Sequence, residues 1–296
     1  MFFHTSCSVW YNQTVVNTEE DTMLADLHIH TTFSDGVYTP EQIVTQARAA
    51  GMGCIAITDH DNIQAYDRAE RMIHFRHLGL KLLRGVEMDT DYKGKDIHVL
   101  GYHFNSTNQE FLQALRWNRV NRIGRAEKMV DRIASLGYSI TFQEVQEEAN
   151  GARSLGRPHI ARVLVKKGLF PTVQSVFDVL LGAGKPAYYR QVKMSPGEAV
   201  ALIHQAGGIA VLAHPAEIEN PVLVEKILDS VPFDGMEVWH PSVLKENPPC
   251  DWLQVAKNHH LFPSGGSDLH GNKGRFPMHL GEFPVQYENV AGIINA

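Results

Sequence analysis

Short apolar runs alternate with amphipathic stretches through the first hundred residues. A continuous apolar run such as 54–58 is typical of a strand buried on both faces of a parallel sheet. Thr39 and Pro40 begin an amphipathic stretch that ends near Gly51, which indicates a helix between two such strands. The predicted strands cover 23–30, 54–58, 81–87 and 96–101, and the predicted helices cover 40–51 and about 62–78. This order predicts a parallel sheet, and closure into a barrel fits a chain of 296 residues.

The alternation stops between about 105 and 190 and then resumes. Helical periodicity dominates the middle stretch, which predicts a small helical domain inserted into a barrel loop. The predicted helices lie near 108–136, 142–150, 157–167 and 172–181, and the later strands include 209–213, 235–238 and 263–265. We therefore expect an N-terminal extension at 1–22, a barrel domain at 23–105 and 191–296, and an insertion at 106–190 that forms a lid over the substrate.

Imidazole and carboxylate side chains gather at the predicted strand ends. His28 and His30 point to the same side of the first strand because alternate side chains share a face. The full set is His28, His30, Asp35, His60, Glu87, His98, His214, Asp268 and His270, of which only Asp35 comes from a turn. Strand ends meet on one face of a barrel, where these groups need cations to neutralise the carboxylates. Nitrogen and oxygen ligands without a thiolate favour Mn, Fe or Zn.

These residues stand in motifs that resemble those of the PHP (polymerase and histidinol phosphatase) superfamily of metal-dependent phosphoesterases. The motifs are His28-x-His30 with Asp35, Thr58–Asp61, Gly85–Glu87, His98, Ala213–Pro215 and Gly266–His270, and the resemblance runs from about 24 to about 285. It implies a distorted (β/α)7 barrel of the α/β class with an inserted helical domain and a centre of two to three metal ions. Manganese is the expected ion, with iron or zinc as alternatives.

The resemblance also implies a division of the ligands among three metals. The first takes His28, His30, Glu87 and Asp268; the second shares Glu87 and adds His98 and His214; the third takes Asp35, His60 and His270. Cations about 3.5–4 Å apart can hold a bridging hydroxide and stabilise both oxygens of an in-line displacement, which favours phosphoester hydrolysis. A serine hydrolase is disfavoured because the sequence has no Gly-x-Ser-x-Gly motif.

Cations in the insertion indicate how the substrate is chosen. Arg122 and Arg125 lie in or beside the apolar stripe of the long helix, where a buried charge needs an anionic partner. Arginine binds phosphate with two parallel hydrogen bonds. Arg157 and His159 open a later helix, where free N–H groups attract anions, and Lys185 lies beside two tyrosines that can stack on a base.

The insertion resembles that of a PHP subgroup of 3′,5′-nucleoside bisphosphate phosphatases and 5′→3′ exoribonucleases. This resemblance implies that Arg122, Arg125, Arg157 and His159 meet substrate phosphates. We expect a metal-dependent phosphatase acting on a small nucleotide with two phosphates or on short oligonucleotides. The alternatives are a histidinol-phosphate phosphatase, a polymerase-associated proofreading module and a non-catalytic metal- or nucleotide-binding module. Glu217 stands where relatives commonly carry a basic residue, which weakens the case for a long polyanion.

Composition narrows the partners and the compartment. The chain is 44% hydrophobic and 20% charged, as is ordinary for a soluble globular protein. Its net charge of −6 argues against a long nucleic acid as partner. Three cysteines without a Cys-x-x-Cys pair favour a reducing cytoplasm. No apolar run approaches the roughly 18 residues of a membrane helix, so we expect no membrane contact, and no obligate protein partner is evident.

Overall fold

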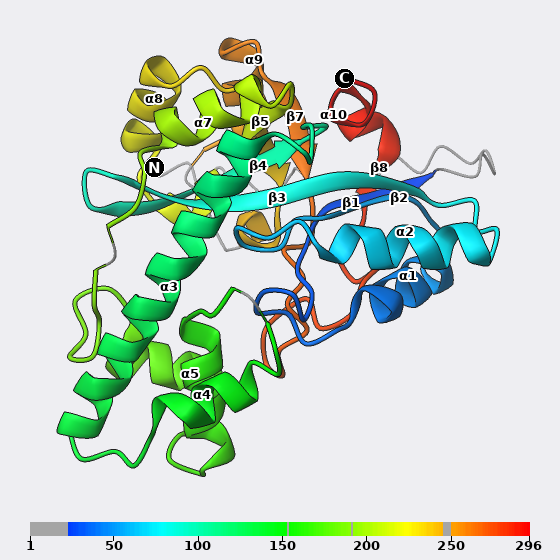
Figure 1. Cartoon of the computed structure of the whole chain (residues 1–296). Helices are drawn as coiled ribbons and strands as arrows, with labels where there is room; N and C mark the ends of the chain where they lie inside the picture. The colour runs from blue at the N-terminus through cyan, green and yellow to red at the C-terminus, as the bar shows by residue number, and fades with distance from the viewer. Residues whose placement is uncertain (1–22, 153, 191, 245–249) are drawn as a thin grey trace, which may run out of the picture.

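The computed structural model describes residues 23–152, 154–190, 192–244 and 250–296, so the predicted extension at 1–22 lies outside the described residues. A single eight-stranded sheet curls into a nearly closed barrel, with the order β7-β6-β5-β4-β3-β2-β1-β8 (Figure 1). The strands are β1 Leu24–Ile29, β2 Met52–Ile57, β3 Lys81–Tyr92, β4 Lys95–Tyr102, β5 Ile209–Leu212, β6 Gly235–Trp239, β7 Phe262–Gly265 and β8 Val285–Gln286. A parallel bridge between Ile29 and Leu269 brings β1 against the segment that follows β7. The predicted distorted barrel is confirmed.

The sheet is not parallel throughout, and this part of the prediction is wrong. β3 pairs antiparallel with β4, β4 pairs antiparallel with β5, and β1 pairs antiparallel with β8. β3 continues past Glu87 to Tyr92 and turns back through Lys93 and Gly94, whose φ angles are 51° and 93°. Two consecutive positive φ angles suit the two-residue turn of a hairpin, so no crossover helix is needed.

The hairpin changes where two predicted ligands lie on their strands. Glu87 is in the middle of β3, and His98 is in the first half of β4, where it pairs with Asp89 of β3. The sequence predicted both residues at the carboxyl ends of their strands, and this position is wrong for both. Because β4 runs against β3, its first half lies at the end of the barrel to which the parallel strands lead. His98 therefore reaches the predicted face from the opposite strand direction.

Helices of the barrel domain cover the outside of the sheet (Figure 1). They are α1 Pro40–Ala49, α2 Ala65–Phe75, α7 Pro196–Gln205, α8 Pro221–Ser230, α9 Trp252–Asn258 and α10 Ala291–Ile294, with short 3-10 turns η2 Pro215–Ile218, η3 Pro241–Leu244 and η4 Tyr287–Val290. Thr39 caps α1 in a reciprocal capping box with Gln42, as the Thr-Pro start predicts. Among the described residues, no helix is long and apolar enough to cross a membrane.

The insertion consists of helices with an apolar core of their own. Its elements are α3 Gln109–Ser135, α4 Phe142–Glu148, α5 Arg157–Lys166, α6 Val173–Val176 and the π-helical turn η1 Phe177–Leu181. The N-terminal part of α3 places Phe111 and Leu115 in the barrel core, whereas Met129 and Ile133 further along pack into the core of the insertion. α3 therefore spans both parts (Figure 1), and its residues include the predicted Arg122 and Arg125.

Candidate metal centre

His28 and His30 face the interior of the barrel end, as their spacing predicts. Both side chains are fully buried, and their Nε2 atoms lie 3.2 Å apart. Ile29 between them packs into the apolar cluster outside the barrel. Gly266 allows the segment after β7 to approach, because a Cβ there would lie 2.4 Å from the backbone nitrogen of His28. The two imidazoles are thus held in place by backbone contacts on both sides.

Glu87 lies at the centre of the predicted set. Its Oε2 is 3.1 Å from His30 Nε2 and 3.1 Å from His60 Nδ1, and its Oε1 is 2.7 Å from His98 Nδ1 and 3.1 Å from His214 Nε2. One carboxylate therefore contacts imidazoles from four different segments of the chain.

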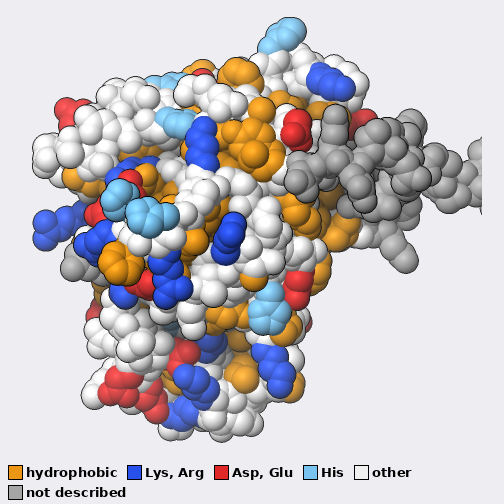
Figure 2. Space-filling view, turned by 90° about the vertical axis from the view of Figure 1, so that its right-hand side faces the viewer, with side chains coloured by type: hydrophobic (Ala, Val, Ile, Leu, Met, Phe, Trp, Pro, Cys, Tyr) orange, Lys and Arg blue, Asp and Glu red, His pale blue; other side chains and the backbone are white. Residues whose placement is uncertain are grey.

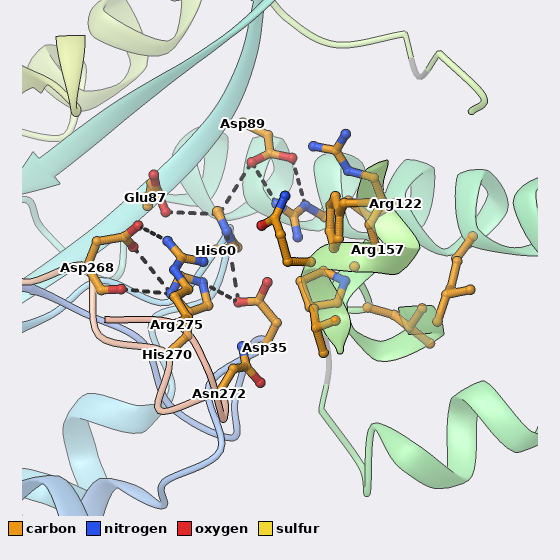
Figure 3. Close-up of a pocket in the computed structure, with 18 of the residues that line it drawn as sticks. Asp35, His60, Glu87, Asp89, Arg122, Arg157, Asp268, His270, Asn272 and Arg275 are labelled. Carbon is orange, nitrogen blue, oxygen red and sulfur yellow. Dashed lines mark hydrogen bonds and ion pairs between the residues drawn. The ribbon is translucent and has the colours of Figure 1, made fainter. Parts of the chain in front are cut away.

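Two aspartates complete the cluster, on either side of His270 (Figure 3). Asp268 Oδ1 lies 3.4 Å from His28 Nε2 and 3.1 Å from His30 Nε2. Asp35 Oδ1 lies 3.3 Å from His270 Nε2 and 3.9 Å from His60 Nε2. The structure therefore brings all nine predicted residues together, and their roles as ligands stay a prediction.

The donor groups fit divalent cations. Among the described residues, four sets have ligand atoms within 4.8 Å of one another: His28, His30, Glu87 and Asp268; His30, Asp35, His60 and His270; His60, Glu87 and His98; and Glu217, His240 and Asp268. The first set equals the first predicted metal site, and the second adds His30 to the third predicted site. The third set has His60 where the second predicted site has His214. One buried oxygen each of Asp35 and Glu87 has no hydrogen-bond partner among the residues that the structure describes, which is costly unless a cation or a proton takes its lone pairs.

Protonation of the cluster shows the same need for positive charge. Burial lowers the pKa of His30, but Asp268 and Glu87 outweigh it and raise that pKa to about 10. Burial also lowers the pKa of His214, and Glu217 and Glu87 outweigh it to give a pKa of about 9. Burial and the nearby Arg122 lower the pKa of His60 to about 4. A metal ion bound at His30 or His214, the predicted ligands, would therefore have to displace a proton.

Two strained backbone positions aim ligands into the site. Asp268 has a φ of 49° and His214 a φ of 28°, a region that residues other than glycine seldom occupy. The backbone N–H of His214 donates to Glu237 Oε2 at 2.7 Å, which holds this turn. The same Glu237 has Oε1 3.0 Å from His28 Nδ1, leaving His28 Nε2 to face the cluster.

Sequence reasoning missed Glu237 and several other residues of the site. A single carboxylate in the apolar strand β6 was the available signal for Glu237. Asp59, which belongs to the Thr58–Asp61 motif, accepts hydrogen bonds from Thr31 and Ser34 and so holds the turn that carries Asp35. Arg275 donates to Asp268 Oδ2 at 2.5 Å from a loop without helical or strand periodicity, so no pattern pointed to it (Figure 3).

A cavity of about 590 Å³ separates the cluster from the insertion. One wall carries members of the cluster, the opposite wall comes from α3, α5 and η1, and a loop with Lys273 and Arg275 forms a third side. Apolar side chains line the insertion end, namely Ala126, Met129, Leu155, Pro158, Ile160, Val173 and Phe177. The cavity thus joins a cluster of ligands to a partly apolar chamber.

The predicted substrate residues of α3 and α5 differ in their surroundings. Arg122 is paired with Asp89, whereas Arg125 donates through Nε to the carbonyl of Tyr189. Within the described part of the chain, the buried Nη2 of Arg125 has no hydrogen-bond partner. Arg157 lies 3.4 Å from Asp96 and its guanidinium stacks 5.5 Å from the centre of the Phe177 ring. All three arginines line the cavity.

The other two predicted substrate residues do not line it. His159 is buried, and its Nδ1 accepts from the backbone N–H of Gly156 at 3.0 Å, which caps α5. Burial and Arg162 lower its pKa to about 4, so it is neutral near pH 7. Lys185 is exposed and lies outside the cavity lining. Direct contact of these two residues with substrate stays a prediction.

The fold and the clustered ligands define a metal-dependent phosphoesterase. Comparison with known proteins agrees, because the PHP domain model matches residues 26–167. A 5′-3′ exoribonuclease of Haemophilus influenzae is 33% identical over 249 residues, covering 83% of this chain and 89% of that protein. The 3′,5′-nucleoside bisphosphate phosphatase of Chromobacterium violaceum is 30% identical over 265 residues, covering 88% of this chain and 92% of that protein. The chain therefore belongs to the PHP family.

Solved structures support the same assignment. A protein from Bifidobacterium adolescentis described as a metal-dependent phosphoesterase matches with a TM-score of 0.81 and 32% identity, over 91% of this chain and 95% of that one. An amidohydrolase from Chromobacterium violaceum with bound sulfate matches with a TM-score of 0.76 and 29% identity, over 83% and 87%. The likeness therefore includes the insertion as well as the barrel.

Proposed function

We propose that this phosphoesterase hydrolyses a phosphate ester of a nucleotide that carries a second phosphate. The substrates are 3′,5′-bisphosphonucleotides, short oligoribonucleotides trimmed from the 5′ end, or both. One phosphate lies at the ligand cluster and the other lies on the arginines of the insertion. The observation that carries this proposal is a guanidinium nitrogen of Arg125, on the cavity wall opposite the cluster, that has no hydrogen-bond partner in the described ranges.

Arg125 has the properties of an anion-binding residue. Its side chain is buried, and burial together with the neighbouring Arg157 lowers its pKa to about 10, so it remains charged at neutral pH. Two neighbouring guanidinium groups with an unsatisfied donor favour a ligand with at least two negative charges. A phosphate monoester meets this requirement, and a single phosphate cannot occupy both this position and the cluster.

The space between the two positions suits a nucleoside. Apolar side chains such as Met129 and Phe177 line this part of the cavity. A 3′,5′-bisphosphonucleotide and the 5′-phosphorylated end of an RNA share one unit, a nucleoside with phosphate on either side. The names of the two relatives, a 5′-3′ exoribonuclease and a 3′,5′-nucleoside bisphosphate phosphatase, therefore refer to substrates that can enter the same cavity in the same orientation.

The residues of the barrel end prepare the site for metal ions. When bound, two or three divalent ions would polarise the phosphate ester and activate water for in-line attack. Glu237 orients His28, and Asp59 holds the turn with Asp35, so the donors are arranged in advance. Manganese is the proposed ion, with iron or zinc as alternatives, because the donors are nitrogen and oxygen only.

The insertion at 106–190 acts as the lid of the cavity, and the enzyme works in the cytoplasm on small nucleotides or short oligonucleotides. A long nucleic acid is not the proposed partner. On the face shown in Figure 2, Lys and Arg side chains are interspersed with acidic and apolar ones, which does not suit a continuous phosphate backbone.

The test compares four substrates with Mn²⁺ present. They are adenosine 3′,5′-bisphosphate, AMP, histidinol phosphate and a 5′-phosphorylated oligoribonucleotide. We expect kcat/KM for the bisphosphate or the oligomer to exceed that for AMP at least about tenfold, since charge-assisted contacts to a second phosphate contribute about 1.5–3 kcal/mol. A preference for histidinol phosphate would overturn the nucleotide proposal. Equal rates on AMP and the bisphosphate would remove the role given to Arg125.

A further inference from the structure

Arg122 lies on the cavity wall beside Arg125, yet its charge is already matched. Its Nε lies 2.8 Å from Asp89 Oδ2 and its Nη2 lies 2.6 Å from Asp89 Oδ1, a two-point contact between buried side chains (Figure 3). Its Nε is also 3.4 Å from Asp61 Oδ2. Two carboxylates therefore surround this guanidinium, which has much less need of a substrate phosphate than that of Arg125.

The same Asp89 also reaches the ligand cluster, through the oxygen that Arg122 Nη2 contacts. Asp89 Oδ1 lies 3.3 Å from His60 Nδ1 and 3.3 Å from His98 Nε2. The other nitrogen of His98, Nδ1, faces the cluster and lies 2.7 Å from Glu87. His60 Nε2 lies 3.9 Å from Asp35, and its Nδ1 is shared between Asp89 and Glu87, whose Oε2 is 3.1 Å away. A carboxylate behind a metal-binding imidazole fixes which nitrogen carries the proton and how the ring is turned.

We infer that Asp89 and Arg122 form a positioning pair for the metal centre, and that Arg122 is not a substrate contact. Asp89 orients His60 and His98, and Arg122 holds Asp89 in place through its two-point contact. The inference rests on the proposed role of the two histidines as metal ligands. It replaces the prediction that Arg122 binds phosphate and leaves the second phosphate to Arg125 and Arg157.

Neighbouring contacts show that the pair is built into the junction between insertion and barrel. Asn118, one turn before Arg122 on α3, donates to Asp61 Oδ1 at 2.6 Å. Lys193 Nζ lies 3.5 Å from Asp89 Oδ2 and 3.0 Å from Asp96 Oδ1. Asp89 is therefore held from α3 and from the segment that returns to the barrel. A carboxylate fixed in this way can hold two imidazole rings in one orientation. An arginine that binds substrate, by contrast, has to be free to exchange its partner for the substrate.

The test compares R122Q and D89N with R125Q as the matched control from the same helix. Mn²⁺ binding to chelator-treated protein is followed by calorimetry, and kcat and KM are measured with adenosine 3′,5′-bisphosphate. We expect R122Q and D89N to weaken Mn²⁺ binding about 10–100-fold, the usual cost of losing a partner behind a metal ligand, with KM at saturating Mn²⁺ within about threefold of wild type. R125Q is expected to raise KM about tenfold or more and to leave Mn²⁺ binding unchanged.

A double variant protects the test against loss of folding. R122Q alone leaves the buried Asp89 short of a partner, whereas D89N/R122Q removes both charges together, and thermal melts show which proteins are folded. The double variant is expected to lose Mn²⁺ affinity by about as much as D89N alone, since the two residues act as one unit. An increased KM for R122Q with unchanged Mn²⁺ binding would overturn the inference. If wild type fails to hydrolyse the bisphosphate, the proposed function fails, and the Mn²⁺ affinities still decide the role of the pair.

Discussion

The ligand cluster of the barrel and the arginines of the insertion face each other across one cavity, but the backbone controls them to different degrees. Eight of the nine barrel residues are aspartates or histidines, whose side chains have only two side-chain torsions, and all nine stand on a strand or in a segment that follows one. The structure gathers eight of the nine into overlapping sets of ligand atoms within 4.8 Å of one another, and His214 Nε2 lies 3.1 Å from Glu87 Oε1. Of the five predicted insertion residues, Arg122 is paired internally, His159 caps a helix and Lys185 is exposed.

The difference shows what fixes a side chain in a functional site. Sheet pairing sets the position of His28 or His98 to within the freedom of one or two torsions. Arg122 and Arg125 stand one turn apart on α3, and their long side chains find different partners. Strand positions therefore predict a site well, whereas helical cations predict only that an anion is close.

Removing one barrel ligand is the largest expected effect. His28→Ala should lower kcat by more than the roughly 10–100-fold that loss of an outer partner costs, because a ligand itself is lost. The free energy of unfolding should fall by only about 1–3 kcal/mol, as for an ordinary buried substitution. Activity assays, metal analysis and thermal melts measure these quantities, with His74→Ala on α2 as a control away from the cluster. Full turnover and full metal content in His28→Ala would refute the central role of the cluster.

A rise in pH should destabilise the metal-free barrel end, where the predicted ligands are protonated. His30 and His214 have folded pKa values of about 10 and about 9 in the metal-free protein, against an ordinary value of 6.5. A histidine whose pKa is higher in the folded than in the unfolded protein stabilises the fold at pH values below its pKa in the unfolded chain. This stabilisation is lost as the pH rises through its pKa in the folded protein. The metal-free protein should therefore lose stability from pH 7 to pH 9.

Mn²⁺ should reverse this trend, because its ligands must be deprotonated. The difference in Tm between Mn²⁺-loaded and chelator-treated protein is expected to widen between pH 7 and pH 9, as measured by scanning calorimetry. Calorimetric titrations in buffers of different ionisation enthalpy should show proton release on binding. A difference in Tm that narrows with pH would contradict the protonation assigned to His30 and His214.

The smallest effect is expected in the insertion at Lys185. Lys185→Ala should change KM for adenosine 3′,5′-bisphosphate less than about twofold, because its side chain is exposed and surface substitutions usually change free energies by about 0.5 kcal/mol or less. Arg157→Gln, which removes a cation from the cavity wall itself, should raise KM by more. If Lys185→Ala raised KM tenfold, the 184–190 segment would have to move onto the substrate. The insertion would then change its conformation when substrate binds.

Much of the fold and the cluster could be predicted from the sequence because both depend on short-range patterns. The apolar runs locate β1, β2 and β5, and histidines and carboxylates at their ends locate the site. The antiparallel hairpin was missed because Lys93 and Gly94 are a weak turn signal beside a strong strand–helix rhythm. Glu237 was missed for a different reason, since its buried position on β6 becomes informative only once the barrel interior is known.

The partners of the long cations could not be predicted in the same way. The helical stripe correctly placed Arg122 and Arg125 on a buried face, and both side chains are buried. It could not distinguish Asp89 from a phosphate as the partner of Arg122, because both are anions of similar reach. Only the distances to Asp89, and the absence of a partner for Arg125 Nη2 among the described residues, separate the two roles.

Closure of the barrel has a consequence for the order of folding. One edge of β1 pairs with the neighbouring β2. Its other edge pairs with β8 and, at Ile29, with Leu269, so that edge is completed only by segments close to the other end of the chain. Contacts so distant in sequence form slowly. During synthesis on the ribosome, residues up to His98 emerge long before His214, Asp268 and His270. We therefore expect a nascent chain to lack a complete metal centre, so that tight metal uptake follows translation and marks the finished protein.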